Sequence, residues 1–238
     1  MILGAAFCPH PPGLIPDLAP GTSAELGPVR AACAEAIASL AAGGGQLVVL
    51  GADNASASHS PLCRGSLAGF GLSEEVHLGS PCGDGQLDLP LSLSIGAWLI
   101  GAAAGSRNGA RGFSIGPGFA TSQAAVELRG LAEAEDISVL VMGDGSARRS
   151  TAAPGYFDHR AADFDAGVAA GLASGDVGAL RDLDPQLGDA VLAAGVPAWR
   201  AAADLLCGVR FDATLVLDVA PFGVGYFVAT WRSVDAGE

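Results

Sequence analysis

The first side chain that could carry out chemistry is the imidazole of His10, in the segment Cys8-Pro-His-Pro-Pro12. Three prolines restrict the backbone around it, so the ring has little freedom before a ligand binds. A pre-organised imidazole of this kind suits a metal ligand or a general base. The same prolines could instead only shape a turn in which His10 hydrogen-bonds a carbonyl group.

A second group of polar side chains lies in residues 51–60, which contain no hydrophobe larger than alanine. Such a small, polar loop can close over a ligand, and we predict that Asp53 and Asn54 bind one. If the loop folds inward, His10, Asp53 and His59 supply two imidazoles and a carboxylate, an acceptable set for Fe(II) or Zn(II). The alternative is a solvated turn in which Asp53 caps its own backbone.

The sequence Gly-Asp-Gly-Ser-Ala-Arg-Arg at residues 143–149 offers a tight turn, backbone N–H donors and two guanidinium groups. Together these groups could bind a carboxylate or a phosphate, so Arg148 and Arg149 are predicted ligand-binding residues. Asp144 and Ser146 stand in the same turn and are predicted catalytic residues. Gly-Asp-Gly is also ordinary turn chemistry, and the arginines could equally be surface or ion-pairing residues.

The two tyrosines of the chain, Tyr156 and Tyr226, each follow a glycine. Close backbone approach is easy there, so both phenols could line a cleft, Tyr156 as a catalytic residue and Tyr226 as a ligand-binding one. The alternative is a core tyrosine that makes one hydrogen bond.

Apolar patterns predict the elements that must position these residues. The predicted strands are Ile2–Phe7, Leu47–Leu50, Glu75–Leu78, Ile137–Met142 and a closing hairpin of Thr214–Val219 and Val224–Trp231. The predicted helices are Ala24–Ala42, Leu91–Ala104, one around Val126–Leu131, and two or three between Arg160 and Cys207, one of them starting at Asp184.

Strands alternating with helices predict an α/β fold with a mostly parallel central sheet, flanking helices and an antiparallel edge hairpin, in a single domain of residues 1–238. In such a sheet, ligands bind outside the carboxyl ends of the strands. The polar turns described above are therefore expected to converge on one cleft.

Composition excludes several functions. The net charge is −13, and all twelve basic residues are arginine. Without lysine, neither a Walker-type phosphate loop nor Schiff-base chemistry is available. The acidic surface repels nucleic acid and anionic membranes, which leaves a small-molecule ligand as the expected partner.

The sequence also favours a cytoplasmic location. Its five cysteines are widely spread and contain no C-x-x-C pair, which suits a reducing compartment. The apolar amino terminus lacks the basic flank of a signal peptide. The apolar stretch Leu87–Ala104 carries Asp88 and Pro90, so we expect a buried helix there rather than a membrane span.

Four motifs in order resemble the β-subunit family of class III extradiol dioxygenases, which also includes the Memo-like proteins. The family opens with a strand leading to His-x-Pro, followed by Asp-His-Ala-Ser, then His-Gly-x-x-Val-Pro-Leu-Ser, and then Gly-x-Ser-His with Phe-Asp further on. The matching segments here are Cys8–Pro12, Asp53–Ser56, Gly85–Ser92, and Gly143–Ala147 with Phe164-Asp165. The resemblance spans about two-thirds of the chain and implies the fold of that family.

The resemblance also implies a family iron site that is largely replaced here. Family chemistry uses an Fe(II) ion bound by two histidines and a glutamate, with further histidines for acid–base work and substrate binding. Only the first ligand is kept, as His10, whereas Asn54 stands at the second histidine. Gly85 and Ala147 replace the later histidines, and the segment Val196–Arg200 around Trp199, where the glutamate is expected, contains no acid.

Three hypotheses follow. The chain is a dioxygenase-like or metal-dependent enzyme for a small molecule, or it is a binding or regulatory protein that kept the fold without the iron chemistry. In the second case the Arg148 and Arg149 turn and the glycine-rich turn 221–225 would bind the ligand. The third hypothesis is a homo-oligomer that acts mainly through self-association.

Overall fold

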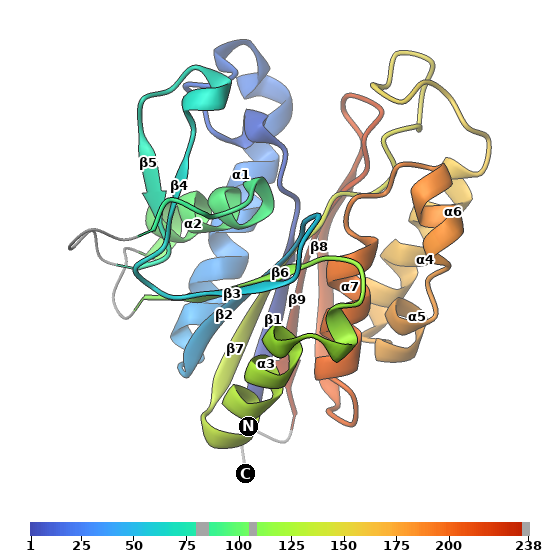
Figure 1. The fold of residues 1–238 in the computed structure, drawn as a ribbon. Coiled ribbons are helices and arrows are strands. Elements are labelled where there is room, and N and C mark those ends of the chain that lie inside the picture. Colours follow the sequence, from blue (N-terminus) through green and yellow to red (C-terminus); the bar gives the residue numbers. More distant parts are fainter. Residues whose placement is uncertain (80–85, 105–108, 235–238) are drawn as a thin grey trace.

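The computed structural model describes residues 1–79, 86–104 and 109–234, so Cys82 and the family position Gly85 lie outside the described residues. Its main feature is a seven-stranded sheet with the order β3-β6-β2-β7-β1-β9-β8 (Figure 1). A separate two-stranded antiparallel sheet pairs β4 with β5. The strands are β1 (Ile2–Cys8), β2 (Gln46–Ala52), β3 (Ala57–His59), β4 (Arg64–Ser66), β5 (Glu75–His77), β6 (Arg111–Ile115), β7 (Ile137–Met142), β8 (Phe211–Val219) and β9 (Tyr226–Ser233).

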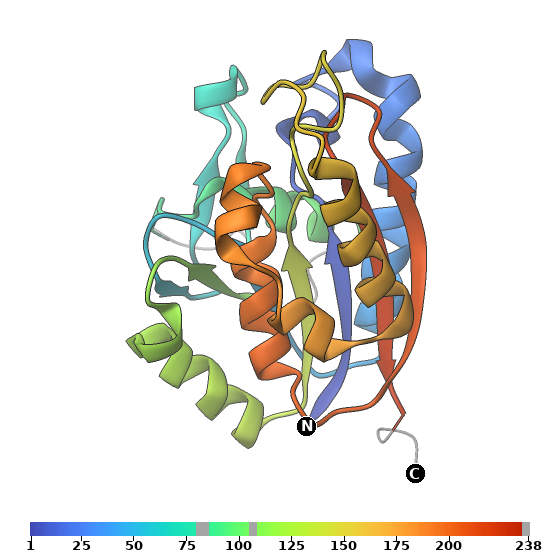
Figure 2. The same ribbon diagram turned by 90° about the vertical axis from the view of Figure 1, so that its right-hand side faces the viewer.

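Helices cover both faces of the sheet. On one face lie α1 and α2, and on the other lie α3, α4, α5 and α7 (Figures 1 and 2). The helices are α1 (Ser23–Ala42), α2 (Leu91–Ala104), α3 (Gln123–Ala134), α4 (Ala161–Ser174), α5 (Val177–Arg181), α6 (Pro185–Ala190) and α7 (Val196–Leu205). The protein is therefore an α/β structure with three layers.

Each layer boundary has its own apolar core, because strand side chains alternate between the faces. In β7, Val139 and Val141 pack with α3, α4 and α7, while Leu140 and Met142 pack with α1 and α2. All six β7 residues are buried, as expected of a central parallel strand covered on both sides. This explains the uninterrupted apolar run in its sequence.

The register of the central strands defines one edge of the sheet. β1 runs parallel to β7, with Cys8 opposite Met142, and antiparallel to β9, with Phe7 opposite Ala229. Continuing both pairings past the strand ends places His10, Asp144 and Tyr226 in one row. Three segments that are far apart in the sequence thus meet at the carboxyl end of β1.

The predicted fold class agrees with the structure at this level: the sheet is mostly parallel, and β8 and β9 form an antiparallel pair at one edge. β3, β4 and β6 were not predicted, although β6 is a central strand that pairs with β2 and β3. In the described part of the chain, no helix is both long enough and apolar enough to cross a bilayer.

Candidate functional site

Two predicted site residues that are far apart in the sequence, His10 and Asp144, lie in contact. The backbone N–H of His10 donates to Asp144 Oδ1 over 2.7 Å, and His10 Nδ1 lies 3.7 Å from the same oxygen. Both side chains are largely buried. Nδ1 is a buried nitrogen without a hydrogen-bond partner among the described residues, so the carboxylate faces the ring without yet bonding to it.

The main chain on both sides of this pair is fixed. Gly143 donates to the carbonyl of Cys8 over 2.9 Å, and Gly195 donates to the carbonyl of Asp144 over 2.8 Å. The indole of Trp199 packs so closely on Gly143 that a Cβ atom there would lie 2.7 Å from its Nε1. The pair therefore sits on rigid backbone, as a pre-organised proton-transfer site requires.

The surroundings at this edge of the sheet favour the protonated forms of Asp144 and Tyr226. Burial raises the pKa of Asp144, and the charge and backbone N–H of His10 oppose that rise. Burial, with a smaller effect of the Asp144 charge, raises the pKa of Tyr226, whose ring is nearly inaccessible. The Tyr226 phenol therefore stays protonated, and it lies close enough to Asp144 for the carboxylate charge to act on it.

The described residues do not form an Fe(II) site around His10. Among the described residues, the one group of three or more His, Cys, Asp or Glu side chains close enough to bind an ion does not include His10. An iron site of the facial-triad type needs two histidines and a carboxylate around open positions. His10 with Asp144 supplies only two of these ligands, so no iron chemistry is assigned to this edge.

Ser146 is held by three hydrogen bonds to other parts of the protein. Its hydroxyl donates to the carbonyl of Val191 over 2.6 Å and accepts from the N–H of Arg148, while its own N–H donates to Asp165 Oδ1. Ser146 is fully buried. A hydroxyl with these partners orders the turn and is not available as a nucleophile.

The two predicted ligand-binding arginines have different surroundings. Arg149 donates to Asp165 Oδ2 over 2.9 Å, so its charge is neutralised within the protein. Its backbone N–H also donates to Gly223, which ties this turn to the glycine-rich turn before β9. Arg148 is half-buried, and its Nε has no hydrogen-bond partner in the described residues.

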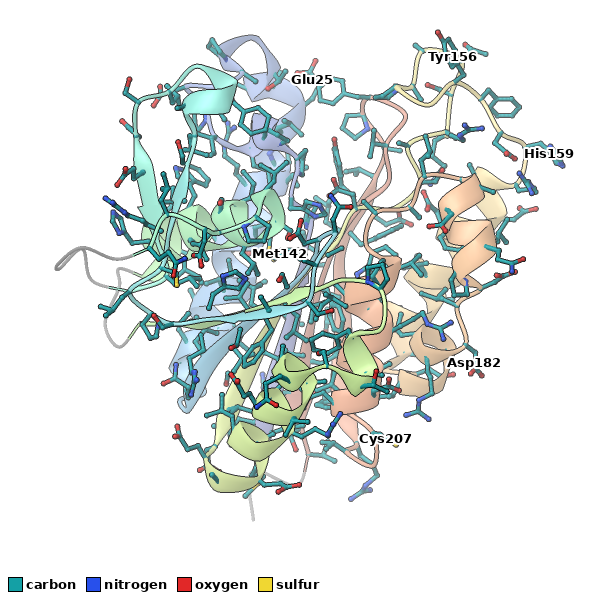
Figure 3. All side chains as sticks on the ribbon, viewed as in Figure 1. Glu25, Met142, Tyr156, His159, Asp182 and Cys207 are labelled. Atoms are coloured by element: carbon teal, nitrogen blue, oxygen red, sulfur yellow. The ribbon has the colours of Figure 1, made fainter. Side chains whose placement is uncertain are left out.

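Tyr156 lies away from the His10 pair. It is 77% exposed, with a left-handed φ of 59°, and Figure 3 shows it near the outer tip of the loop between β7 and α4. His159 lies on the same loop and is also exposed. The structure thus brings together one of the two tyrosines, Tyr226, with the predicted catalytic carboxylate.

Asp53 and Asn54 are both exposed in the turn after β2. The N–H of Asp53 donates to Ile115 in β6, and no contact of the described residues joins either side chain to His10. At the family positions, Ala147 is half-buried and Trp199 is buried against Phe227. None of these positions supplies a ligand atom to the His10 pair.

His59 lies at the β3 edge of the sheet, far from His10. It ends β3, four strands away from β1, a separation of about 19 Å at roughly 4.8 Å per strand. Its ring instead meets Cys63 and Asp88, and one ligand atom from each lies within 4.8 Å of the others. The predicted set of His10, Asp53 and His59 is therefore not assembled.

Sequence reasoning missed Cys63 and Asp88 as partners of His59. Cys63 follows His59 by four residues, which was the one local signal, whereas Asp88 approaches from the segment before α2. Burial raises the pKa of the Cys63 thiol, a hydrogen bond from Ser60 opposes this, and Asp88 raises it further. A protonated thiol does not support a resting thiolate nucleophile at this position.

Comparisons with known proteins leave the family open. Neither a scan against protein-family models nor a search of curated proteins finds a match to this chain.

Proposed function

We propose that the protein is a divergent relative of the class III extradiol dioxygenases that does not cleave rings, and that it binds a small molecule beside His10 and Asp144. The observation that carries the proposal is the largely buried imidazole–carboxylate pair at the carboxyl ends of β1 and β7. Four ordered sequence motifs support the family, and the first of them contains His10. Parallel sheets commonly bind ligands at this edge.

The pair can move a proton at the far ring nitrogen of His10. Asp144 faces Nδ1 and can orient the ring through that nitrogen, as the carboxylate does in other imidazole–carboxylate pairs. Nε2 makes no hydrogen bond within the described residues, so it is the atom that meets a ligand. A distance of 3.7 Å between His10 Nδ1 and Asp144 Oδ1 is compatible with a hydrogen bond that shortens when a ligand binds.

The same site could serve a binding or regulatory protein without turnover. The absence of a described third metal ligand around His10 favours this candidate over an iron enzyme. The two candidates make the same prediction for ligand binding and differ in whether the bound molecule is changed.

A binding experiment tests the proposal. The probe is 3,4-dihydroxybenzoate, the catechol cleaved by the type member of the family, titrated calorimetrically into wild type, His10→Gln and Asp144→Asn. Loss of one charge-assisted hydrogen bond, about 1.5–3 kcal/mol, predicts roughly 10–100-fold weaker binding to His10→Gln. The matched control is His159→Gln, which removes an exposed histidine from the outer loop and should leave affinity unchanged.

Oxygen uptake is then measured with added Fe(II) and the same catechol. No oxygen consumption above the protein-free rate is expected. Steady oxygen uptake with ring-fission product would contradict the loss of iron chemistry, and equal binding by wild type and His10→Gln would contradict the site.

A further inference from the structure

A second group of possible metal ligands lies at the β3 edge of the sheet, where His59, Cys63 and Asp88 converge. Their ligand atoms are an imidazole nitrogen, a sulfur and a carboxylate oxygen, all within 4.8 Å of one another. His59 and Cys63 are buried, and the Asp88 side chain is 33% exposed. The cluster is therefore enclosed on the protein side and open to solvent at its carboxylate.

The hydrogen bonds of Ser114 determine which nitrogen of His59 carries a proton. Ser114 Oγ donates its one hydrogen to the carbonyl of Ala55 over 2.9 Å. It can therefore only accept from His59 Nε2, which lies 3.2 Å away. Nε2 carries the proton, and in a neutral ring Nδ1 presents a lone pair to the other members of the cluster.

This lone pair has no partner. His59 Nδ1 is buried and makes no hydrogen bond in the described part of the chain, although the His59 side chain is only 5% exposed. It lies 3.6 Å from Asp88 Oδ1, which is too far for a hydrogen bond. A lone pair that faces a carboxylate at this distance is repulsive unless a positive charge lies between the two atoms.

The distance suits two ligands of one metal ion. Zinc binds nitrogen and oxygen at about 2.1 Å, so two such ligands in a tetrahedral site lie about 3.4 Å apart. The 3.6 Å between His59 Nδ1 and Asp88 Oδ1 is close to that value. A catalytic triad of Cys63, His59 and Asp88 would need the thiol and the carboxylate to bond to different ring nitrogens. Ser114 already bonds to Nε2, so the geometry does not suit a triad.

The backbone around the cluster holds the three residues in place. The N–H of Cys63 donates to the carbonyl of Ser60 over 3.0 Å, which closes the turn after β3. The carbonyl of Arg64 accepts from the N–H of Asp88 over 3.1 Å, and this brings the segment before α2 against Cys63. Both contacts are independent of any ion, so the site is largely pre-formed.

We propose that His59, Cys63 and Asp88 bind a divalent transition-metal ion of the zinc type, with Ser114 as the positioning residue that orients the imidazole. Mixed nitrogen, sulfur and oxygen ligands suit zinc, and a metal-binding histidine usually donates its other ring N–H to an oxygen acceptor, here the Ser114 hydroxyl. Three protein ligands leave one tetrahedral position for water or a small anion at the solvent side of Asp88. The site does not depend on the function proposed for His10.

The test uses Zn(II) and its spectroscopic substitute Co(II) with the full chain freed of metal by a chelator. Wild type should bind one Co(II) per chain with a thiolate-to-cobalt absorption band in the near ultraviolet. Outer-shell partners alone cost 10–100-fold in affinity, so Ser114→Ala should weaken binding by about that factor. His59→Ala and Asp88→Asn should weaken it more, and Cys63→Ser should also abolish the band.

Matched controls come from the same chain. Cys207→Ser removes an exposed free thiol after α7, and His159→Ala removes an exposed histidine that lies 3.9 Å from Asp158. Neither should change the stoichiometry, the affinity or the band. A band that persists in Cys63→Ser, or equal affinity in His59→Ala and wild type, would overturn the site.

A measurement on the unmodified chain guards against variants that fail to fold. Zn(II) should slow iodoacetamide alkylation of Cys63, located by peptide mass spectrometry, at least about tenfold, while alkylation of the exposed Cys207 continues at its metal-free rate. Equal slowing of both thiols, or of neither, would show that zinc does not bind at Cys63.

Discussion

At the scale of single residues, two carboxylates at the carboxyl edge, Asp165 buried and Asp144 largely buried, differ in how their charge is compensated. Asp165 receives the Arg149 guanidinium at 2.9 Å and the Ser146 N–H at 2.8 Å. Asp144 receives the backbone N–H of His10 and faces its ring at a longer distance. The first arrangement is a completed structural ion pair, and the second leaves capacity to bond to a ligand.

Arg149→Met should be strongly destabilising. Asp165 is 1% exposed, so removal of its cationic partner leaves a buried carboxylate without charge compensation. Breaking a buried pair in this way costs about 3–5 kcal/mol of unfolding free energy, which urea denaturation measures. The double variant Arg149→Met with Asp165→Asn should recover much of the loss.

The control for this prediction is Arg181→Met. Arg181 also pairs with an aspartate, Asp204, at 3.4 Å, but the Asp204 side chain is 62% exposed, and exposed ion pairs contribute little to stability. A loss in Arg181→Met as large as that in Arg149→Met would show that burial of the carboxylate is not the cause.

Asp144 should make stability depend on pH in a definite direction. Because burial raises its pKa above the ordinary 3.8, the folded protein binds a proton more tightly than the unfolded chain. The resulting stabilisation is complete below 3.8 and is lost as the pH rises through the folded-state pKa. The unfolding free energy of wild type minus that of Asp144→Asn should therefore fall as the pH rises across this window.

Urea unfolding of both proteins over a pH series measures this difference. Asp17→Asn, which changes an exposed carboxylate far along the chain from Asp144, provides the control. A difference that is flat with pH, or that grows as the pH rises, would contradict a raised Asp144 pKa.

At the scale of elements, two glycine substitutions should have opposite effects. Gly167 is an exposed residue inside α4, and a Cβ atom added to it would meet only open space, so Gly167→Ala should stabilise the helix by roughly 0.5–1 kcal/mol. A Cβ on Gly4 would lie 2.7 Å from the carbonyl oxygen of Trp231 in the paired strand. Gly4→Ala should push β1 away from β9 and lower the free energy of unfolding by about 1–3 kcal/mol.

Thermal and urea unfolding of the two variants measures the predicted gain in stability for Gly167→Ala and the predicted loss for Gly4→Ala. Near-equal stability of wild type and Gly4→Ala would mean that β9 can move away from β1 without loss, contrary to the close strand approach in the structure.

Elements with a strong local signal were predictable from the sequence. Asp184 was predicted to start a helix before Pro185, and its side chain accepts the N–H groups of Gln186 and Leu187 at the start of α6. β6 gave no comparable signal, because its sequence Arg-Gly-Phe-Ser-Ile holds only two large hydrophobes. Gly112 and Ser114 are needed there for close packing and for the His59 hydrogen bond, which removes the apolar pattern.

At the scale of the whole molecule, the sequence predicted which residues follow strands better than it predicted which of them meet. His10 and Asp144 were expected at the ends of two strands, and the parallel register of β1 and β7 makes them neighbours. His59 was predicted to share a metal ion with His10 and Asp53 if its loop folded inward, but its short strand joins the far edge of the sheet. Strand order is a long-range property, so the pairing of His59 with Asp88 had no local signature.

The central place of β1 has a consequence for the order in which the chain can fold. β1 is the first of these strands to be synthesised, yet its two neighbours are residues 137–142 and 226–233. During synthesis, the backbone N–H and C=O groups of β1 that face β9 stay unpaired until β9 has left the ribosome. A nascent chain stalled before Tyr226 would expose this apolar strand to chaperones and to other nascent chains, so premature termination is expected to yield aggregates rather than a partly active protein.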